Sequence, residues 1–230
     1  MFLVAAIILI AILFMGGFWF YQPRFLILLL QQLLADIIFS VKTTRPLFAI
    51  TFDDGPSSST SQIVDILGQY NASGTFFFIG TKAKLHPKIL PKLKASGHQI
   101  CNHFYDSQLT LFLNDKQIVK SLQKADQIIK QNRHNKFIRP SGSIFRPSLT
   151  RLVKMFGFTV VLGSAYTMDW LKPPKWYMRW ALGRMLKPGA IVILHESTRN
   201  LQTLQFLLDE GNKKGLRAVT LTKLVSAKTS

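Results

Sequence analysis

Short apolar runs alternate with helical patterns along the chain from Lys42 onward. The runs are rich in aromatic and β-branched residues, which is typical of buried strands. They occupy residues 48–52, 75–79, 99–101, 137–139, 158–162, 190–194 and 217–220. Strands that alternate with helices predict an α/β fold, with a mostly parallel sheet that is either covered by helices or closed into a barrel.

The segments between these runs carry helix start and stop signals. Pro87 lies near the start of one segment and Gly97 at its end, as proline and glycine commonly do in helices. Asn114 precedes a long pattern of apolar residues at helical spacing, and asparagine is a preferred N-cap residue. The remaining helices are predicted at residues 60–73, 148–156, 175–186 and 200–212.

Residues 1–20 contain no charged side chain and are almost wholly apolar. About 20 helical residues cross the hydrocarbon core of a bilayer. Trp19 and Tyr21 supply interfacial aromatic rings, and Arg24 follows them. Since no basic segment precedes the run and no small-residue cleavage site is evident, the sequence predicts a retained single-pass transmembrane anchor at residues 1–23.

Residues 24–44 continue the apolar composition, but Gln31, Gln32 and Asp36 interrupt it. An amphipathic helix that lies on the membrane or packs on the domain is favoured over a second span. The soluble domain is predicted to occupy residues 45–230. No repeat or linker divides it, and one cysteine, Cys101, excludes an internal disulfide.

The chain is strongly basic, with 29 Lys and Arg against 11 Asp and Glu and a net charge of +18. This charge indicates anionic surroundings, such as membrane lipid head groups or acidic envelope polymers. Nucleic acid is not expected as a partner, because the sequence has no helix-turn-helix, zinc-finger or RNA-recognition signature. With so few acids, each acid beside a strand end carries more weight.

Polar side chains follow the predicted strands where each one ends. Asp53 and Asp54 end the first strand, before Gly55 and Pro56. The later strands are followed by His103 and Asp106, by Arg139, by Asp169 and Trp170, and by His195 and Glu196. Taken singly, each is more often a turn or a structural residue. Because the carboxyl ends of parallel strands share one face, their coincidence favours an active site.

The residue types define the chemistry that such a site supports. Carboxylate oxygen and imidazole nitrogen suit Zn²⁺ or a similar divalent ion, which acidifies bound water and polarises a carbonyl. A second carboxylate can take the proton of the water, and a histidine can protonate a leaving amine. The set therefore indicates metal-assisted hydrolysis of an amide or ester.

The same residues resemble the polysaccharide deacetylases, the carbohydrate esterase 4 family with a NodB-homology domain. The motifs that carry the resemblance are Thr51-Phe52-Asp53-Asp54-Gly55-Pro56, Asn102-His103, Arg139-Pro140, Asp169-Trp170 and Ile193-Leu194-His195. They occur in the order of the family and span residues 45–225. The resemblance implies a distorted (β/α) barrel that removes N-acetyl groups from amino-sugar polymers.

The resemblance also implies a role for each site residue. Asp53 would be the general base, oriented by Arg139, and His195 the general acid, tuned by Asp169. Asp54 and His103 would bind the metal. The substrate-binding side chains would be Trp170, Ile193 and Tyr105.

The sequence departs from the family pattern after the first histidine. Ser107 stands where the family has a second metal-binding histidine, and Phe104 where it has Thr or Ser. Asp106 is the predicted third metal ligand, because residues three apart share one face of a helix or turn. The resemblance implies zinc, whereas a site with two carboxylates would shift preference to Mn²⁺ or Mg²⁺.

The leading functional prediction is a membrane-anchored, metal-dependent deacetylase of an N-acetylated glycan. The loss of histidine at Ser107 keeps open a catalytically impaired relative that only binds glycan, and hydrolysis of another non-peptide C–N bond is a further alternative. Arg24, Lys42 and Arg45 follow the anchor, which by the positive-inside rule favours a cytoplasmic domain. The expected substrate lies outside, so an extracytoplasmic domain is predicted.

Overall fold

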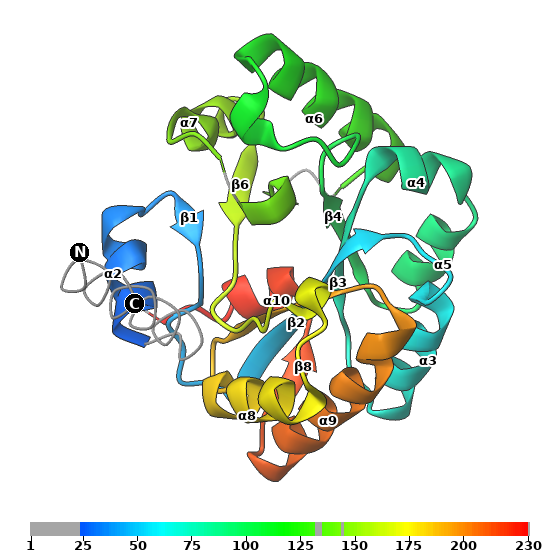
Figure 1. Cartoon of the computed structure of the whole chain (residues 1–230), viewed down its shortest axis with the longest axis vertical. Coiled ribbons are helices and arrows are strands. Elements are labelled where there is room, and N and C mark those ends of the chain that lie inside the picture. The colour runs from blue at the N-terminus through cyan, green and yellow to red at the C-terminus, as the bar shows by residue number, and fades with distance from the viewer. Residues whose placement is uncertain (1–23, 132–134, 144, 230) are drawn as a thin grey trace, which may run out of the picture. The chain divides into compact units, whose positions relative to one another are not determined.

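The computed structural model describes residues 24–131, 135–143 and 145–229 (Figure 1). The chain divides after Ala35 into two units, and the described part of the first is helix α2 (Arg24–Leu33). The anchor predicted at residues 1–23 lies outside the described residues. Within the described ranges, no helix is both long enough and apolar enough to cross a membrane.

The second unit, residues 36–230, is built on a parallel sheet of eight strands (Figure 1). The strands are β1 (Ile37–Ile38), β2 (Leu47–Gly55), β3 (Thr75–Phe78), β4 (Gln99–Asn102), β5 (Lys136–Ile138), β6 (Phe158–Val161), β7 (Ile191–His195) and β8 (Arg217–Val219). Their order is β1-β6-β5-β4-β3-β2-β7, with β8 alongside the start of β2. Each of the seven predicted strands corresponds to one of β2–β8, so that prediction is confirmed.

The sheet curls until its two ends approach each other. Ala165, just after β6, bridges Val192 of β7 in parallel, and the backbone N–H of Ile193 donates to the Ala165 carbonyl at 2.9 Å. A curled parallel sheet with helices around it fits the distorted (β/α) barrel that the sequence predicts.

Strand β1 was not predicted, because two isoleucines inside a longer apolar run carry no strand signal of their own. Ile37 pairs with Val160 and Ile38 with Val161 on β6. The sheet therefore begins before residue 45, where the sequence places the start of the domain. Residues 37–38, included in the predicted juxtamembrane segment, are part of the barrel wall.

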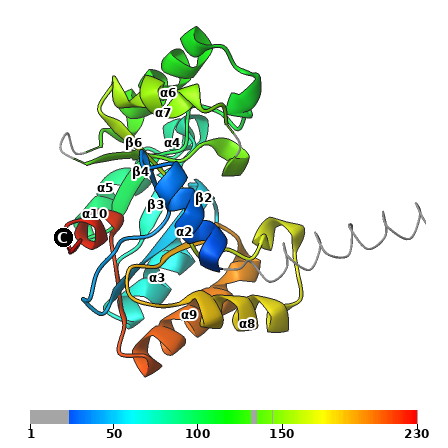
Figure 2. The ribbon, with the colours of Figure 1, turned by 90° about the vertical axis from the view of Figure 1, so that its left-hand side faces the viewer.

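Eight α-helices of the second unit cover or close the described sheet. They are α3 (Thr60–Gln69), α4 (Gly80–Leu85), α5 (Ile89–Ala95), α6 (Asp115–Ile129), α7 (Ser148–Lys154), α8 (Lys175–Met185), α9 (Leu201–Lys213) and α10 (Leu221–Val225). The predicted cap of α6 is confirmed: Asn114 accepts the backbone N–H of Gln117 at 2.9 Å, and the Gln117 side chain accepts that of Asn114. Helices α8 and α9 lie side by side (Figure 2).

The pleat of β2 separates two apolar clusters. Phe48, Ile50 and Phe52 belong to the cluster that includes residues of α3, α8 and α9. Leu47 and Ala49 belong to the other, with Phe77, Cys101 and Phe137 from the neighbouring strands. Because side chains alternate along a strand, Thr51 and Asp53 continue the face of Leu47 and Ala49. That face changes from apolar to polar at the carboxyl end of the strand.

Candidate active site

Asp53 and Asp54 are adjacent in β2, so a regular strand would point them to opposite faces. The pairing of β2 with β3 shifts register between Phe52 and Gly55, and Asp54 has a left-handed φ of 65°. A bulge of this kind re-aims a side chain, and aspartate tolerates positive φ better than most residues. The two carboxylates therefore contact different partners at the same end of the sheet: Asp53 contacts Arg139, and Asp54 contacts His103.

Asp53 is held by Arg139, which follows β5 and is fully buried. The Arg139 guanidinium donates to Asp53 Oδ1 at 2.6 Å and to Thr51 Oγ1 at 2.8 Å. It also donates to the carbonyls of Val161 at 3.0 Å and Leu162 at 2.8 Å. These four hydrogen bonds from one guanidinium hold Asp53 in place and join β2 to the end of β6 across the sheet.

The backbone of Arg139 fixes the second pair. His103 Nδ1–H donates to the Arg139 carbonyl at 2.6 Å, since a carbonyl can only accept. His103 Nε2 then lies 3.3 Å from Asp54 Oδ1. The hydrogen bond from His103 lowers the pKa of Asp54, against the opposing effect of burial. One arginine thus positions both Asp53 and the partner of Asp54.

Asp54 and His103 fit a divalent ion as two of its ligands. His103 donates its Nδ1–H to the Arg139 carbonyl, so Nε2 is the ring nitrogen that faces Asp54 and that would bind an ion in place of its contact with Asp54. Carboxylate oxygen and imidazole nitrogen are common ligands of Zn²⁺. The described residues contain no cluster of three or more His, Cys, Asp and Glu that would hold a metal.

Asp106 is not brought to this pair, which differs from the prediction. Residues 103–107 are not helical, and Phe104 has a φ of 61°, so residues three apart do not share a face there. The Asp106 side chain instead accepts the backbone N–H of Gln108 at 3.3 Å within its own loop. Ser107, at the position of the family's second histidine, is exposed. The remaining positions of an ion would fall to water or substrate.

His195 ends β7 and forms a second anchored pair with Asp169 of the short helix η3 (Asp169–Leu171). His195 Nδ1–H donates to Asp169 Oδ1 at 2.7 Å, and its backbone N–H donates to Oδ2 at 2.7 Å. The Asn200 amide donates to Asp169 Oδ2 and to the His195 carbonyl. Asp169 is therefore fixed by three donors and fixes the imidazole in turn.

The pKa of His195 is raised to about 9. Burial favours the neutral imidazole, but the hydrogen bond to Asp169 and the charges of Asp169, Asp53 and Asp54 outweigh burial. His195 is consequently protonated at neutral pH. With Nδ1 engaged by Asp169, Nε2 is the nitrogen left to donate a proton.

A cleft of about 350 Å³ opens beside His195. It is lined by Asp169, Trp170, Lys172, His195, Ser197, Arg199 and Asn200. Trp170, predicted to bind substrate, is one of these lining residues. Ile193 packs near Gly163, whose missing Cβ would lie 2.6 Å from its Cγ1. Tyr105 is not among the lining residues: its ring lies beneath the Lys124 ammonium, 4.8 Å from the ring centroid.

Glu196 directly follows β7 and contacts the segment after Asp53 and Asp54. Sequence reasoning gave it no role. Its Oε2 accepts the backbone N–H of Ser57 at 3.0 Å and the hydroxyls of Ser57 and Thr60, while Oε1 is buried and has no hydrogen-bond partner among the described residues. A Cβ on Gly55 would lie 2.2 Å from that Oε1 and 2.5 Å from Cε1 of the fully buried Phe78, so a larger residue would have to displace both side chains. Burial outweighs the hydrogen bonds and raises the pKa of Glu196 from 4.5 to about 7.

This buried carboxyl predicts a pH-dependent stability. The folded chain keeps the Glu196 proton up to about pH 7, whereas the unfolded chain loses it near pH 4.5. Folding therefore takes up a proton in that range, and stability falls as pH rises through it, by up to about 3 kcal/mol. Glu196→Gln should remove this loss in denaturant titrations between pH 5 and 8. Glu210→Gln, at a half-buried acid of α9 that pairs with Lys213, is the control. Parallel curves for Glu196→Gln and wild type would refute the assignment.

Asn200 is the other residue that sequence reasoning missed. It stands after β7, at the end of the short helix η4 (Thr198–Asn200), and it belongs to none of the motifs that carry the family resemblance. Its contact with Asp169 joins residues 31 positions apart. Only the folding of η3 against the end of β7 creates that contact, so no local signal could have found it.

Comparison with known proteins gives a consistent result. A sequence model of the family described as polysaccharide deacetylase matches residues 40–161, just over half of the chain. The peptidoglycan-N-acetylglucosamine deacetylase of Bacillus cereus is 28% identical over 200 residues, which cover 84% of this chain and 94% of the relative.

Two solved structures are also similar. The Bc1960 peptidoglycan N-acetylglucosamine deacetylase has a TM-score of 0.78 and 26% identity, covering 84% of this chain and 94% of that chain. A family 4 pseudoenzyme from Bacillus anthracis has a TM-score of 0.77 at 20% identity, covering 84% and 70%. The second likeness shows the fold alone.

Proposed function

The chain belongs to the polysaccharide deacetylase family, and on that premise we propose that it hydrolyses N-acetyl groups of an amino-sugar glycan and releases acetate. Such an enzyme is a hydrolase of non-peptide C–N bonds. The observation that carries the proposal is the pair of anchored groups, Asp53 with Arg139 and His195 with Asp169, at the same end of the sheet as Asp54 and His103. Relatives named for peptidoglycan favour that class of glycan.

The two anchored groups suit opposite proton transfers. Asp53, held by Arg139, accepts a proton from the attacking water, whose oxygen adds to the acetyl carbonyl carbon. His195 holds a proton on Nε2 at neutral pH and gives it to the sugar nitrogen as the C–N bond breaks. The products are acetate and a free amine. A protein that only binds glycan, without turnover, has no need of both a base and an acid.

Metal dependence is part of the proposal. Asp54 and His103 would hold a divalent ion, whose chemistry when bound is to acidify water and polarise the acetyl carbonyl. Zinc is favoured by family resemblance. A site with few protein ligands leaves Mn²⁺ or Mg²⁺ as alternatives.

Acetate release tests the function directly. Purified full-length protein should release acetate from N-acetylated peptidoglycan fragments, lose that activity after chelation, and regain it with one of Zn²⁺, Mn²⁺ or Mg²⁺. The rival function is glycan binding without turnover, favoured by Ser107 and by the absence of a third ligand among the described residues. Glycan binding without acetate release under every metal condition would establish the rival.

Asp169→Asn should move the alkaline limb of the pH–activity profile. Activity requires protonated His195, so the wild-type rate should fall as pH rises past about 9. The variant loses the negative charge that raises this pKa and turns the charge-assisted hydrogen bond into a weaker neutral one, while burial still lowers the pKa, so the limb should shift down by about 2 units or more. Profiles of kcat/KM measure the shift. Asp65→Asn, at an exposed acid of α3, should leave the limb in place, and an unmoved limb in Asp169→Asn would exclude His195 as the acid.

The proposed location is a membrane, with residues 1–23 as anchor and the domain outside the cytoplasm. The uncharged apolar run and the glycan substrate support this placement. Membrane-bound protein should resist carbonate extraction and be cut by protease added to intact spheroplasts. A mature N-terminus beyond residue 20 would contradict the anchor.

A further inference from the structure

An exposed surface beside the cleft combines aromatic and basic side chains. The chain has four tryptophans, and the three in the described part, Trp170, Trp176 and Trp180, lie within eleven residues. Their side chains are 63%, 66% and 42% exposed. We call the exposed side chains of residues 170–180 the Trp–cation face. Single exposed hydrophobic residues are ordinary on protein surfaces, but a cluster of this kind marks an interaction site.

Helix α8 carries large apolar side chains on its outer side as well as on its inner side. Its inner side is formed by the buried residues Tyr177, Met178, Ala181, Leu182 and Met185. Its outer side carries Trp176 and Trp180 next to Lys175 and Arg179, all exposed. A helix on the surface of a globular domain normally presents polar residues there. Two large aromatic rings on the outer side indicate that this side is covered by something apolar.

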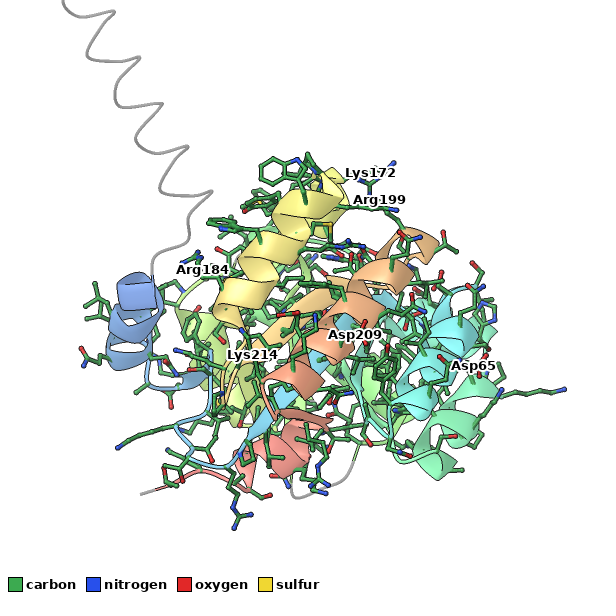
Figure 3. All side chains as sticks on the ribbon, turned by 90° about the horizontal axis from the view of Figure 1, so that it is seen from below. Asp65, Lys172, Arg184, Arg199, Asp209 and Lys214 are labelled. Carbon is green, nitrogen blue, oxygen red and sulfur yellow. The ribbon has the colours of Figure 1, made fainter. Side chains whose placement is uncertain are left out.

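The tryptophan rings are supported from beneath. The Tyr177 ring, itself buried, lies 6.2 Å from the Trp176 ring and 6.0 Å from the Trp180 ring, between centroids. The Arg184 guanidinium lies 5.1 Å from the centroid of Trp180. In Figure 3, Lys172 and Arg199 lie near the N-terminal end of α8 and Arg184 near its other end. The face is thus a built platform flanked by cations.

Charge selects the occupant of this platform. Residues 170–187 contain no Asp or Glu, and Lys172, Lys175 and Arg179 are exposed. A second copy of the chain would bring like charges together, which is unfavourable. Tryptophan rings with lysine and arginine are the side chains that concentrate at the interface of a bilayer, where the ring meets the acyl boundary and the cation meets the head group. Exposed Leu171 adds apolar area to the same face.

We propose that the Trp–cation face docks on the surface of a bilayer containing anionic phospholipid. Each cation near such a surface favours the docked state by about fivefold, and the tryptophans enter the head-group region. Trp170 also lines the cleft of His195, so docking brings the rim of the cleft to the lipid surface. A consequence, which rests on the proposed function, is that acetyl groups would be removed from glycan close to the membrane.

Quenching of tryptophan fluorescence by brominated lipid tests the docking without an activity measurement. Full-length protein carrying Trp19→Phe is reconstituted into vesicles of brominated phosphatidylcholine, with or without phosphatidylglycerol. Emission of the three remaining tryptophans should be quenched in the anionic vesicles. It should be restored in about 1 M salt, where the screening length falls to about 3 Å.

A charge-matched pair of variants completes the test. Replacing Lys172, Lys175 and Arg179 together with glutamine should lower the ratio of docked to free domain by about a hundredfold and abolish quenching. Replacing Lys116, Lys120 and Lys124, three exposed lysines of α6, should leave quenching intact. Equal quenching in the two triple variants would overturn the proposal. Equal quenching of the unsubstituted face in vesicles with and without phosphatidylglycerol would overturn it as well. So would emission that responds only to soluble glycan chains.

Discussion

Asp53→Asn is expected to lower the rate of acetate release by about 10²–10⁴-fold, the usual contribution of a general base. Asparagine has the shape of aspartate but cannot take the proton of the attacking water. Arg139 keeps its hydrogen bonds to Thr51 and to the carbonyls of Val161 and Leu162, so the variant should still fold. The measurement is kcat with saturating glycan, beside thermal unfolding to confirm the fold.

His195→Ala should cause a loss of similar size, and the double variant should be little worse than either single one. A base and an acid that serve consecutive steps of one hydrolysis act as a unit, so their contributions do not add. Asp65→Asn supplies the control for a general loss of negative charge. Near-wild-type rates in both Asp53→Asn and His195→Ala would refute the assignment of base and acid.

The strands were predictable because each is a short buried run with turn residues at its ends. Phe76, Phe77 and Phe78 of β3 are all buried, as expected of a parallel strand covered on both faces. The bulge at Asp54 was not predictable, because no residue pattern in the sequence indicates a shift in the register between β2 and β3. Strand β1 was not predicted because its two residues lie inside a longer apolar run and only their pairing with β6 makes them a strand.

The site residues that stand at strand ends were predictable from the sequence. The site residues that stand in loops were not. Asp53, Arg139 and His195 stand at strand ends, and parallel topology alone brings such positions to one face. Asp106 stands in a loop, and the helical spacing assumed for it does not apply after the left-handed turn at Phe104. Asn200 and the carbonyl of Arg139 hold the site by tertiary contacts that chain order does not reveal.

Arg139 is the residue on which the architecture of the site depends most, and Arg139→Met should destabilise the fold by about 3–5 kcal/mol. The buried guanidinium joins β2 to the end of β6 and neutralises Asp53. Methionine fills similar volume above Phe77, whose ring lies 4.1 Å from the guanidinium carbon, but leaves the buried carboxylate without its cation. Denaturant titration at pH 7 measures the loss, and Arg151→Met, at an exposed arginine of α7, should stay within about 0.5 kcal/mol of wild type.

The pairing is isolated by adding Asp53→Asn to Arg139→Met. If the cost arises from an uncompensated buried charge, the double variant should recover a substantial part of it, with a coupling energy of about 1–3 kcal/mol. Additive costs, or a loss below about 1 kcal/mol in Arg139→Met, would contradict the electrostatic account. The hydrogen bond to His103 comes from the Arg139 backbone, which methionine retains. Arg139→Met should therefore bind added Zn²⁺ nearly as well as wild type at pH 7, while losing the orientation of Asp53 and with it most of the turnover.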